Sequence, residues 1–87
     1  MNSTASEQSA RGAHEALDIL RKRLLVAPHD ADLRLELAHP LFALNHLEDA
    51  TVELRKVIAL SPNHLEARKF LRKVLSAVAT QGHELDS

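Results

Sequence analysis

The chain repeats itself at a spacing of 34 residues. Residues 16–42, aligned with residues 50–76, share eight identical pairs among 27, where about two or three are expected by chance in a sequence so rich in leucine and alanine. The identical pairs are Ala16/Ala50, Leu20/Leu54, Arg21/Arg55, Lys22/Lys56, Pro28/Pro62, Arg34/Arg68, Leu37/Leu71 and Leu41/Leu75. Because a short repeat cannot bury its apolar face alone, neighbouring copies must stack against each other.

The apolar residues recur three and four positions apart, which is typical of helices with one buried face. This spacing predicts an all-α fold with four helices, and strand signals are almost absent. The predicted helices cover residues 13–27, 31–44, 47–60 and 64–79. The turns between them have two to four residues, so consecutive helices are expected to be antiparallel.

Several residues predict where these helices begin and end. Pro28 ends the first helix, and Asp30 is placed to accept a hydrogen bond from the free N–H groups that start the second. Asn45 stands where a left-handed residue closes a helix, a conformation that asparagine tolerates well. Asn63 with Glu66 is predicted to form a capping pair for the fourth helix.

The polar ends of the chain predict a simple domain organisation. Residues 1–12 are expected to form a disordered or frayed leader, in which Gly12 weakens any helix by about 1 kcal/mol. Residues 13–81 form the helical domain. Residues 82–87 form a polar tail.

Composition excludes several classes of protein. The 87 residues include no cysteine, so disulfides, thiolate metal sites and cysteine catalysis are excluded. A net charge of −1 and only two aromatic residues, Phe42 and Phe70, argue against nucleic-acid binding. No apolar run is long enough to cross a membrane, and no signal peptide begins the chain. We therefore expect a cytoplasmic protein with no cofactor, no nucleic-acid partner and no membrane partner.

One complete repeat unit carries a known pattern. Its residues are Arg34-x2-Leu37-Ala38-x2-Leu41, Ala50-x3-Leu54 and Pro62, with half-units before it (Ala16-x3-Leu20, Pro28) and after it (Leu71, Leu75). In length and spacing the unit resembles the tetratricopeptide repeat family. The resemblance covers about residues 13–79. It implies antiparallel helix hairpins, stacked with a right-handed superhelical lean.

The chain departs from that family pattern at positions where the family has large aromatic residues and at one position where it has a small residue. Arg34 replaces the usual tryptophan and Leu41 the usual tyrosine. Arg72 stands where the family has a small residue, which suggests that no further hairpin packs on the fourth helix in the usual way. The chain is also shorter than the three or so repeats that a stable stack needs, which favours self-association.

The resemblance implies a shallow concave groove lined by the first helix of each hairpin. The expected groove residues are Leu35, His39, Phe42, Lys69, Lys73 and Ser76. The favoured function is a non-catalytic module that binds a segment of a protein or peptide partner there. Lys69 and Lys73 share one helix face and suit an acidic peptide, a carboxylate terminus or a phosphate; the alternative is a solvated basic face.

A structural homo-oligomer is the second function that the sequence leaves open. Incomplete repeat stacks from two copies would complete each other and bury Leu35, Phe42 and the bend at Pro40. Pro40 lies inside the second predicted helix, where it removes a backbone hydrogen bond at a cost of about 3 kcal/mol. It is either a shaped bend at a binding face or a tolerated local kink.

The six histidines give no metal or catalytic pattern. They are His14, His29, His39, His46, His64 and His83. No two have the spacing of four residues that places both imidazoles on one helix face. No Ser-His-Asp arrangement follows from the spacing either, so solvated or capping histidines and the absence of an enzyme are expected.

Overall fold

The computed structural model describes the backbone of residues 2–86 and the side chains of residues 10–81. Over this part of the chain the fold is all-α, as predicted, with no strand. The four helices are α1 (Asn2–Val26), α2 (Ala31–Ala43), α3 (Leu47–Leu60) and α4 (Leu65–Asp86).

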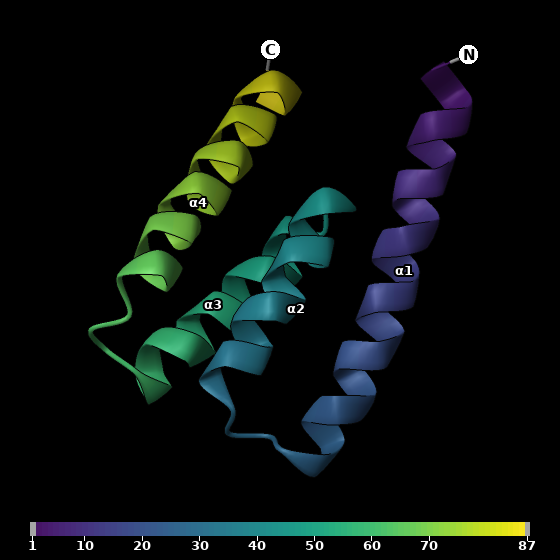
Figure 1. Cartoon of the computed structure of the whole chain (residues 1–87). Helices are drawn as coiled ribbons and strands as arrows, with labels where there is room; N and C mark the ends of the chain where they lie inside the picture. Colours follow the sequence, from purple (N-terminus) through teal and green to yellow (C-terminus); the bar gives the residue numbers. More distant parts are fainter. Residues whose placement is uncertain (1, 87) are drawn as a thin grey trace.

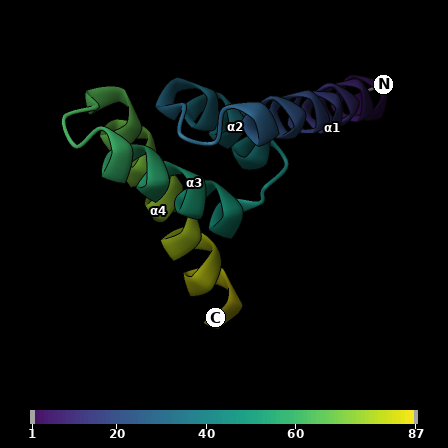
Figure 2. The same ribbon diagram turned by 90° about the horizontal axis from the view of Figure 1, so that it is seen from below.

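The helices run alternately up and down, so that each is antiparallel to the next (Figure 1). α1 packs against α2, α2 against α3, and α3 against α4. The two long helices lie on the outside in Figure 1, with α2 and α3 between them, and Figure 2 shows that α1 and α4 run in different directions. The short turns force this order, because each leaves the chain only enough length to reverse its direction.

The core is aliphatic and joins all four helices. Four large side chains in it have less than 2% of their surface exposed: Leu41, Leu54, Val57 and Val74. Two alanines, Ala38 of α2 and Ala50 of α3, are fully buried in the same cluster. Small residues there allow the backbones of neighbouring helices to approach closely.

The 34-residue repeat is visible as a repeated hydrogen bond. The Arg34 Nε donates to the Pro28 carbonyl at 2.9 Å, and the Arg68 Nε donates to the Pro62 carbonyl at 2.7 Å. Each arginine thus ties the first turns of α2 or α4 to the proline that ends the preceding helix. The two halves of the chain have the same local structure at this point.

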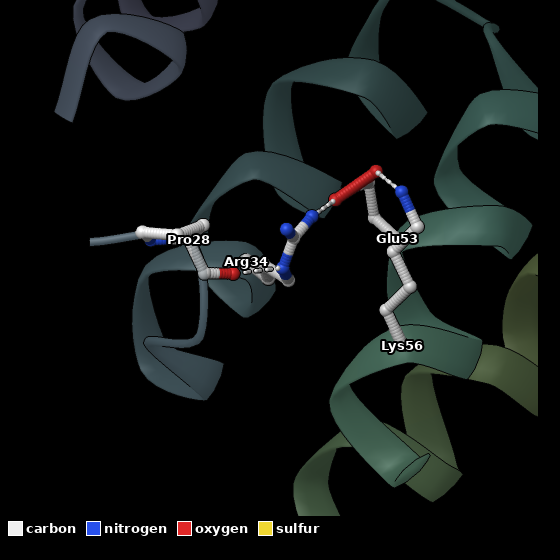
Figure 3. A network of polar contacts seen from close by, with 4 residues as sticks. All are labelled: Pro28, Arg34, Glu53 and Lys56. Carbon is white, nitrogen blue, oxygen red and sulfur yellow. Dashed lines mark hydrogen bonds and ion pairs between the residues drawn. The ribbon is translucent and has the colours of Figure 1, made fainter. Parts of the chain in front are cut away.

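In the first half, this arginine also reaches the following helix. The Arg34 Nη1 donates to Glu53 Oε1 at 2.7 Å, and the Lys56 Nζ lies 3.5 Å from the other carboxylate oxygen (Figure 3). Both Arg34 and Glu53 are largely removed from solvent, so their pairing fixes the position of α3 on α2.

Two of the predicted helix ends are confirmed. Asp30 Oδ1 accepts a hydrogen bond from the Leu33 N–H at 3.1 Å, as expected of the residue that caps α2. Asn45 has φ of 63°, the left-handed conformation predicted for it. The N–H groups of Asn45 and His46 donate to the carbonyls of Phe42 and Leu41, which closes the end of α2.

The predicted cap of α4 is wrong by one residue. α4 begins at Leu65, so His64, rather than Asn63, precedes its first turn. The His64 Nδ1 accepts from the Ala67 N–H at 3.2 Å, and its Nε2 lies 3.7 Å from Asp32 Oδ1 on α2. An unprotonated imidazole nitrogen of His64 therefore caps α4, a role that the sequence analysis had assigned to Asn63 with Glu66.

α1 begins at Asn2 and α4 continues to Asp86, so both helices extend into the segments assigned from the sequence to the leader and the tail; that division of the chain stays a prediction. Gly12 lies in open space within α1, so it costs only its intrinsic helix penalty of about 1 kcal/mol. α4 continues because Ala79 stands where the first half has the left-handed Asn45. No residue there favours a turn, and the helix passes the point at which α2 ends.

Pro40 is accommodated within α2, which continues to Ala43, and its ring is buried. We expect Pro40→Ala to raise the free energy of unfolding by about 1 kcal/mol in urea denaturation. With alanine at position 40, its N–H group can donate to the Glu36 carbonyl, which stabilises the fold by about 3 kcal/mol at most. The loss of two buried methylene groups of the proline ring costs about 1.6 kcal/mol. A destabilised variant would instead show that the ring packing outweighs the missing bond.

None of the helices described between residues 2 and 86 is long and apolar enough to cross a membrane.

Candidate binding groove between α2 and α4

A shallow hollow of about 310 Å³ lies between the exposed sides of α2 and α4. It is lined by His39 and Phe42 from α2 and by Glu66, Lys69, Phe70 and Lys73 from α4. These six residues are called the α2–α4 groove below. The groove faces solvent and is wide enough for one or two side chains of a bound segment.

Three rings form its apolar wall. The centroids of His39 and Phe70 lie 4.6 Å apart, and those of Phe42 and Phe70 lie 5.6 Å apart with planes at 82°. An edge-to-face pair of this kind is a favoured aromatic geometry. The rings pack against one another and give the groove an apolar side.

The charged side of the groove is mainly positive. The Lys73 Nζ lies 5.2 Å from the centroid of the Phe42 ring, within the range of a cation–π contact. Lys69 lies one helical turn before Lys73 on α4, and Glu66 supplies the single carboxylate. The groove therefore offers two ammonium groups beside an aromatic wall.

The structure brings together four of the six residues that the sequence predicted for the groove: His39, Phe42, Lys69 and Lys73. Leu35 does not belong to it, because only 6% of its surface is exposed and it packs in the core. Ser76 is exposed but lies outside the lining.

Sequence reasoning missed Phe70 and Glu66, which the structure adds to the groove. The sequence contained a pattern that could have identified both residues as part of the groove. Glu66, Phe70 and Lys73 follow one another at spacings of four and three residues, so a helix places them on the same side. Phe70 is also one of only two phenylalanines, and the other, Phe42, was assigned to the groove.

A second and larger hollow, of about 640 Å³, lies between the beginning of α3 and the later turns of α4. Its α4 wall is formed by Leu75, Val78 and Gln81, and the Gln81 Nε2 donates to Asn45 Oδ1 at 2.6 Å. Its α3 wall includes the carboxylates Glu48 and Asp49. This hollow was not predicted.

The histidines that the structure describes do not converge. His14, His29 and His46 are exposed on separate elements, His39 stacks on Phe70, and His64 caps α4. Among residues with described side chains, no three histidine, aspartate or glutamate groups gather at a metal-binding distance. His83 lies outside the described side chains.

Comparison of the chain with models of protein families, with curated proteins and with solved structures finds no match in any of the three.

Proposed function

We propose that the protein is a non-catalytic interaction module that binds a segment of a protein partner in the α2–α4 groove. The observation that carries this proposal is the meeting of three rings and two lysines from separate helices in one open hollow. An apolar wall beside two ammonium groups suits a segment in which a carboxylate neighbours an apolar side chain.

The tetratricopeptide resemblance and the cytoplasmic location belong to the same proposal. The 34-residue period and the repeated arginine–proline hydrogen bond support the repeat assignment. The absence of cysteine from the sequence is compatible with a reducing compartment.

Affinity capture tests the proposal with a double charge reversal, Lys69→Glu with Lys73→Glu. We expect the reversal to reduce capture of a specific partner from the lysate of the source cells by about tenfold or more, because both favourable charges become repulsive. The helical circular dichroism should stay unchanged, since both side chains are exposed.

The matched control reverses two other exposed charges, Arg21→Glu with Arg55→Glu, which occupy equivalent repeat positions away from the groove. It changes the net charge by the same amount and should leave capture unaltered. Equal loss in both double variants would assign the binding to overall charge and contradict a site in the groove.

The homo-oligomer that the sequence left open is less well supported in its original form. Leu35 and Pro40, which it would bury, are already buried within a single chain. Phe42 is only partly covered but is held by Phe70. Most of the surface that was expected to join two copies is therefore already buried within a single chain.

A further inference from the structure

The connections that lead into α2 and α4 have the same backbone hydrogen bonds, and both lie at the same end of the molecule (Figure 1). Before α2, the Asp30 N–H donates to the Ala27 carbonyl at 3.2 Å, and the Asp30 carbonyl accepts from the Arg34 N–H at 3.1 Å. Before α4, His64 makes the two equivalent bonds at 3.0 and 3.1 Å. Asp30 and His64 therefore occupy equivalent positions in the 34-residue repeat.

The two residues cap their helices with different chemical groups. Asp30 Oδ1 accepts from the Leu33 N–H at 3.1 Å, and His64 Nδ1 accepts from the Ala67 N–H at 3.2 Å. An aspartate carboxylate remains an acceptor above about pH 5, whereas an imidazole nitrogen accepts only while it carries no proton. Because histidine typically takes up a proton at about pH 6.5, the cap of α4 changes within a pH range in which the cap of α2 does not.

Three features of the site disfavour a protonated ring at His64. A proton on Nδ1 would face the Ala67 N–H, so that two donors would oppose each other. The His64 side chain is only 19% exposed, which leaves little water to solvate a charge. The first turn of a helix also carries a partial positive charge, which repels a cation. Binding of a proton at Nδ1 and capping of α4 therefore exclude each other.

The carboxylate of Asp32 on α2 opposes this effect. Its Oδ1 lies 3.7 Å from the His64 Nε2, but the Asp32 side chain is 89% exposed, and Glu36, one turn further along α2, is exposed as well. An ion pair with so exposed a partner contributes little, because solvent screens it. Other charged residues near the adjoining helix ends have contacts elsewhere: Lys56 with Glu53, Arg68 with the Pro62 carbonyl, and Glu66 and Lys69 at the α2–α4 groove. The loss of the cap therefore outweighs the ion pair.

We propose that His64 is a pH-sensitive cap, which holds the first turn of α4 at neutral pH and releases it when the pH falls below about 6.5. This turn leads directly into Lys69, Phe70 and Lys73, which form the α4 side of the α2–α4 groove together with Glu66. Acidification therefore loosens that side of the groove, while α2 stays capped by Asp30. The device rests on the geometry of the cap and does not depend on what the groove binds.

The sign of the pH dependence follows from the hydrogen bond that protonation breaks. In the unfolded chain the His64 imidazole takes up a proton without giving up a contact, whereas in the folded chain it must give up the Ala67 N–H. The folded state therefore holds fewer protons at this position at about pH 6.5. Folding stability falls as the pH falls through that range, and it returns as the pH rises again.

Urea unfolding of the full chain at about pH 7.5 and about pH 5.5, on either side of the histidine range, tests the proposal. The comparison is with His64→Asn, because asparagine caps helices well and does not titrate. Between the two pH values, we expect the folding equilibrium constant of the wild type to fall about threefold more than that of the variant. Asp32→Asn should enlarge this loss to about fivefold, since the opposing carboxylate is removed.

His29→Asn is the matched control, because His29 is exposed before α2 and Asn63 stands at the equivalent place before α4. This variant should keep the full wild-type loss. Imidazole nitrogen NMR at neutral pH gives a second readout, in which His64 should carry its proton on Nε2 and none on Nδ1. A proton on Nδ1, or the same pH profile in the wild type and His64→Asn, overturns the proposal. So does a wild type that gains stability in acid relative to His64→Asn, because the ion pair with Asp32 would then outweigh the cap.

Discussion

Replacing Leu54 with alanine is expected to lower the free energy of unfolding by about 2–5 kcal/mol. Leu54 is fully buried in α3, in the cluster that also contains residues of α1, α2 and α4. Three carbon atoms would leave a space that no neighbouring side chain is free to fill. The free energy of unfolding of a domain is about 5–15 kcal/mol in total, so the substitution removes a large share of its stability.

Urea unfolding followed by circular dichroism measures this loss as a lower midpoint at an unchanged slope. Val52→Ala is the matched control, because Val52 lies on the same helix with 46% of its surface exposed. It should change stability by no more than about 0.5 kcal/mol. A similar small effect of Leu54→Ala would mean that α3 does not occupy the centre of the fold.

The helix ends could be predicted from the sequence wherever the backbone or side chain of a nearby residue determines them. Pro28 has no N–H group, and Asp30 has a side-chain oxygen within reach of the next free N–H groups. Asn45 accepts a left-handed backbone. Each effect depends on residues only a few positions away, so the sequence was enough to place the corresponding helix ends.

The errors at the other helix ends have a different cause. Asn63 and His64 are both able to cap a helix, and the choice between them depends on where α4 docks. In the structure His64 also lies near Asp32 of α2, a contact 32 positions away in the chain. The fourth helix was predicted to end near Ala79 and Gly82, but a single glycine costs a helix only about 1 kcal/mol, and α4 continues to Asp86.

The groove could be predicted in part because a helix fixes which residues share a side. The spacing of Lys69 and Lys73 places them together, and both line the groove. Leu35 shares a side of α2 with His39 and Phe42, but it is 6% exposed and packs in the core, so it does not line the groove. The identity of a helix's neighbours is a property of the whole fold, and the periodicity of α2 alone does not contain it.

The second large effect on stability is expected from a substitution that adds atoms to a closely packed part of the core. Ala50→Leu should destabilise the protein by about 1–3 kcal/mol, because Ala50 has no exposed surface and lies in the core beside α2. Thermal unfolding should show a fall of about 4–8 °C for each kcal/mol in a domain of this length.

The repeat provides the control for this change within the same chain. Ala16 occupies the position equivalent to Ala50, but it is only partly buried. Ala16→Leu adds the same three carbon atoms where solvent can be displaced, so its melting temperature should stay close to that of the wild type. Equal melting temperatures for the two variants would show that α2 and α3 are not closely packed at Ala50. The Arg34–Glu53 pair would then have to position α3 without the support of a tight core.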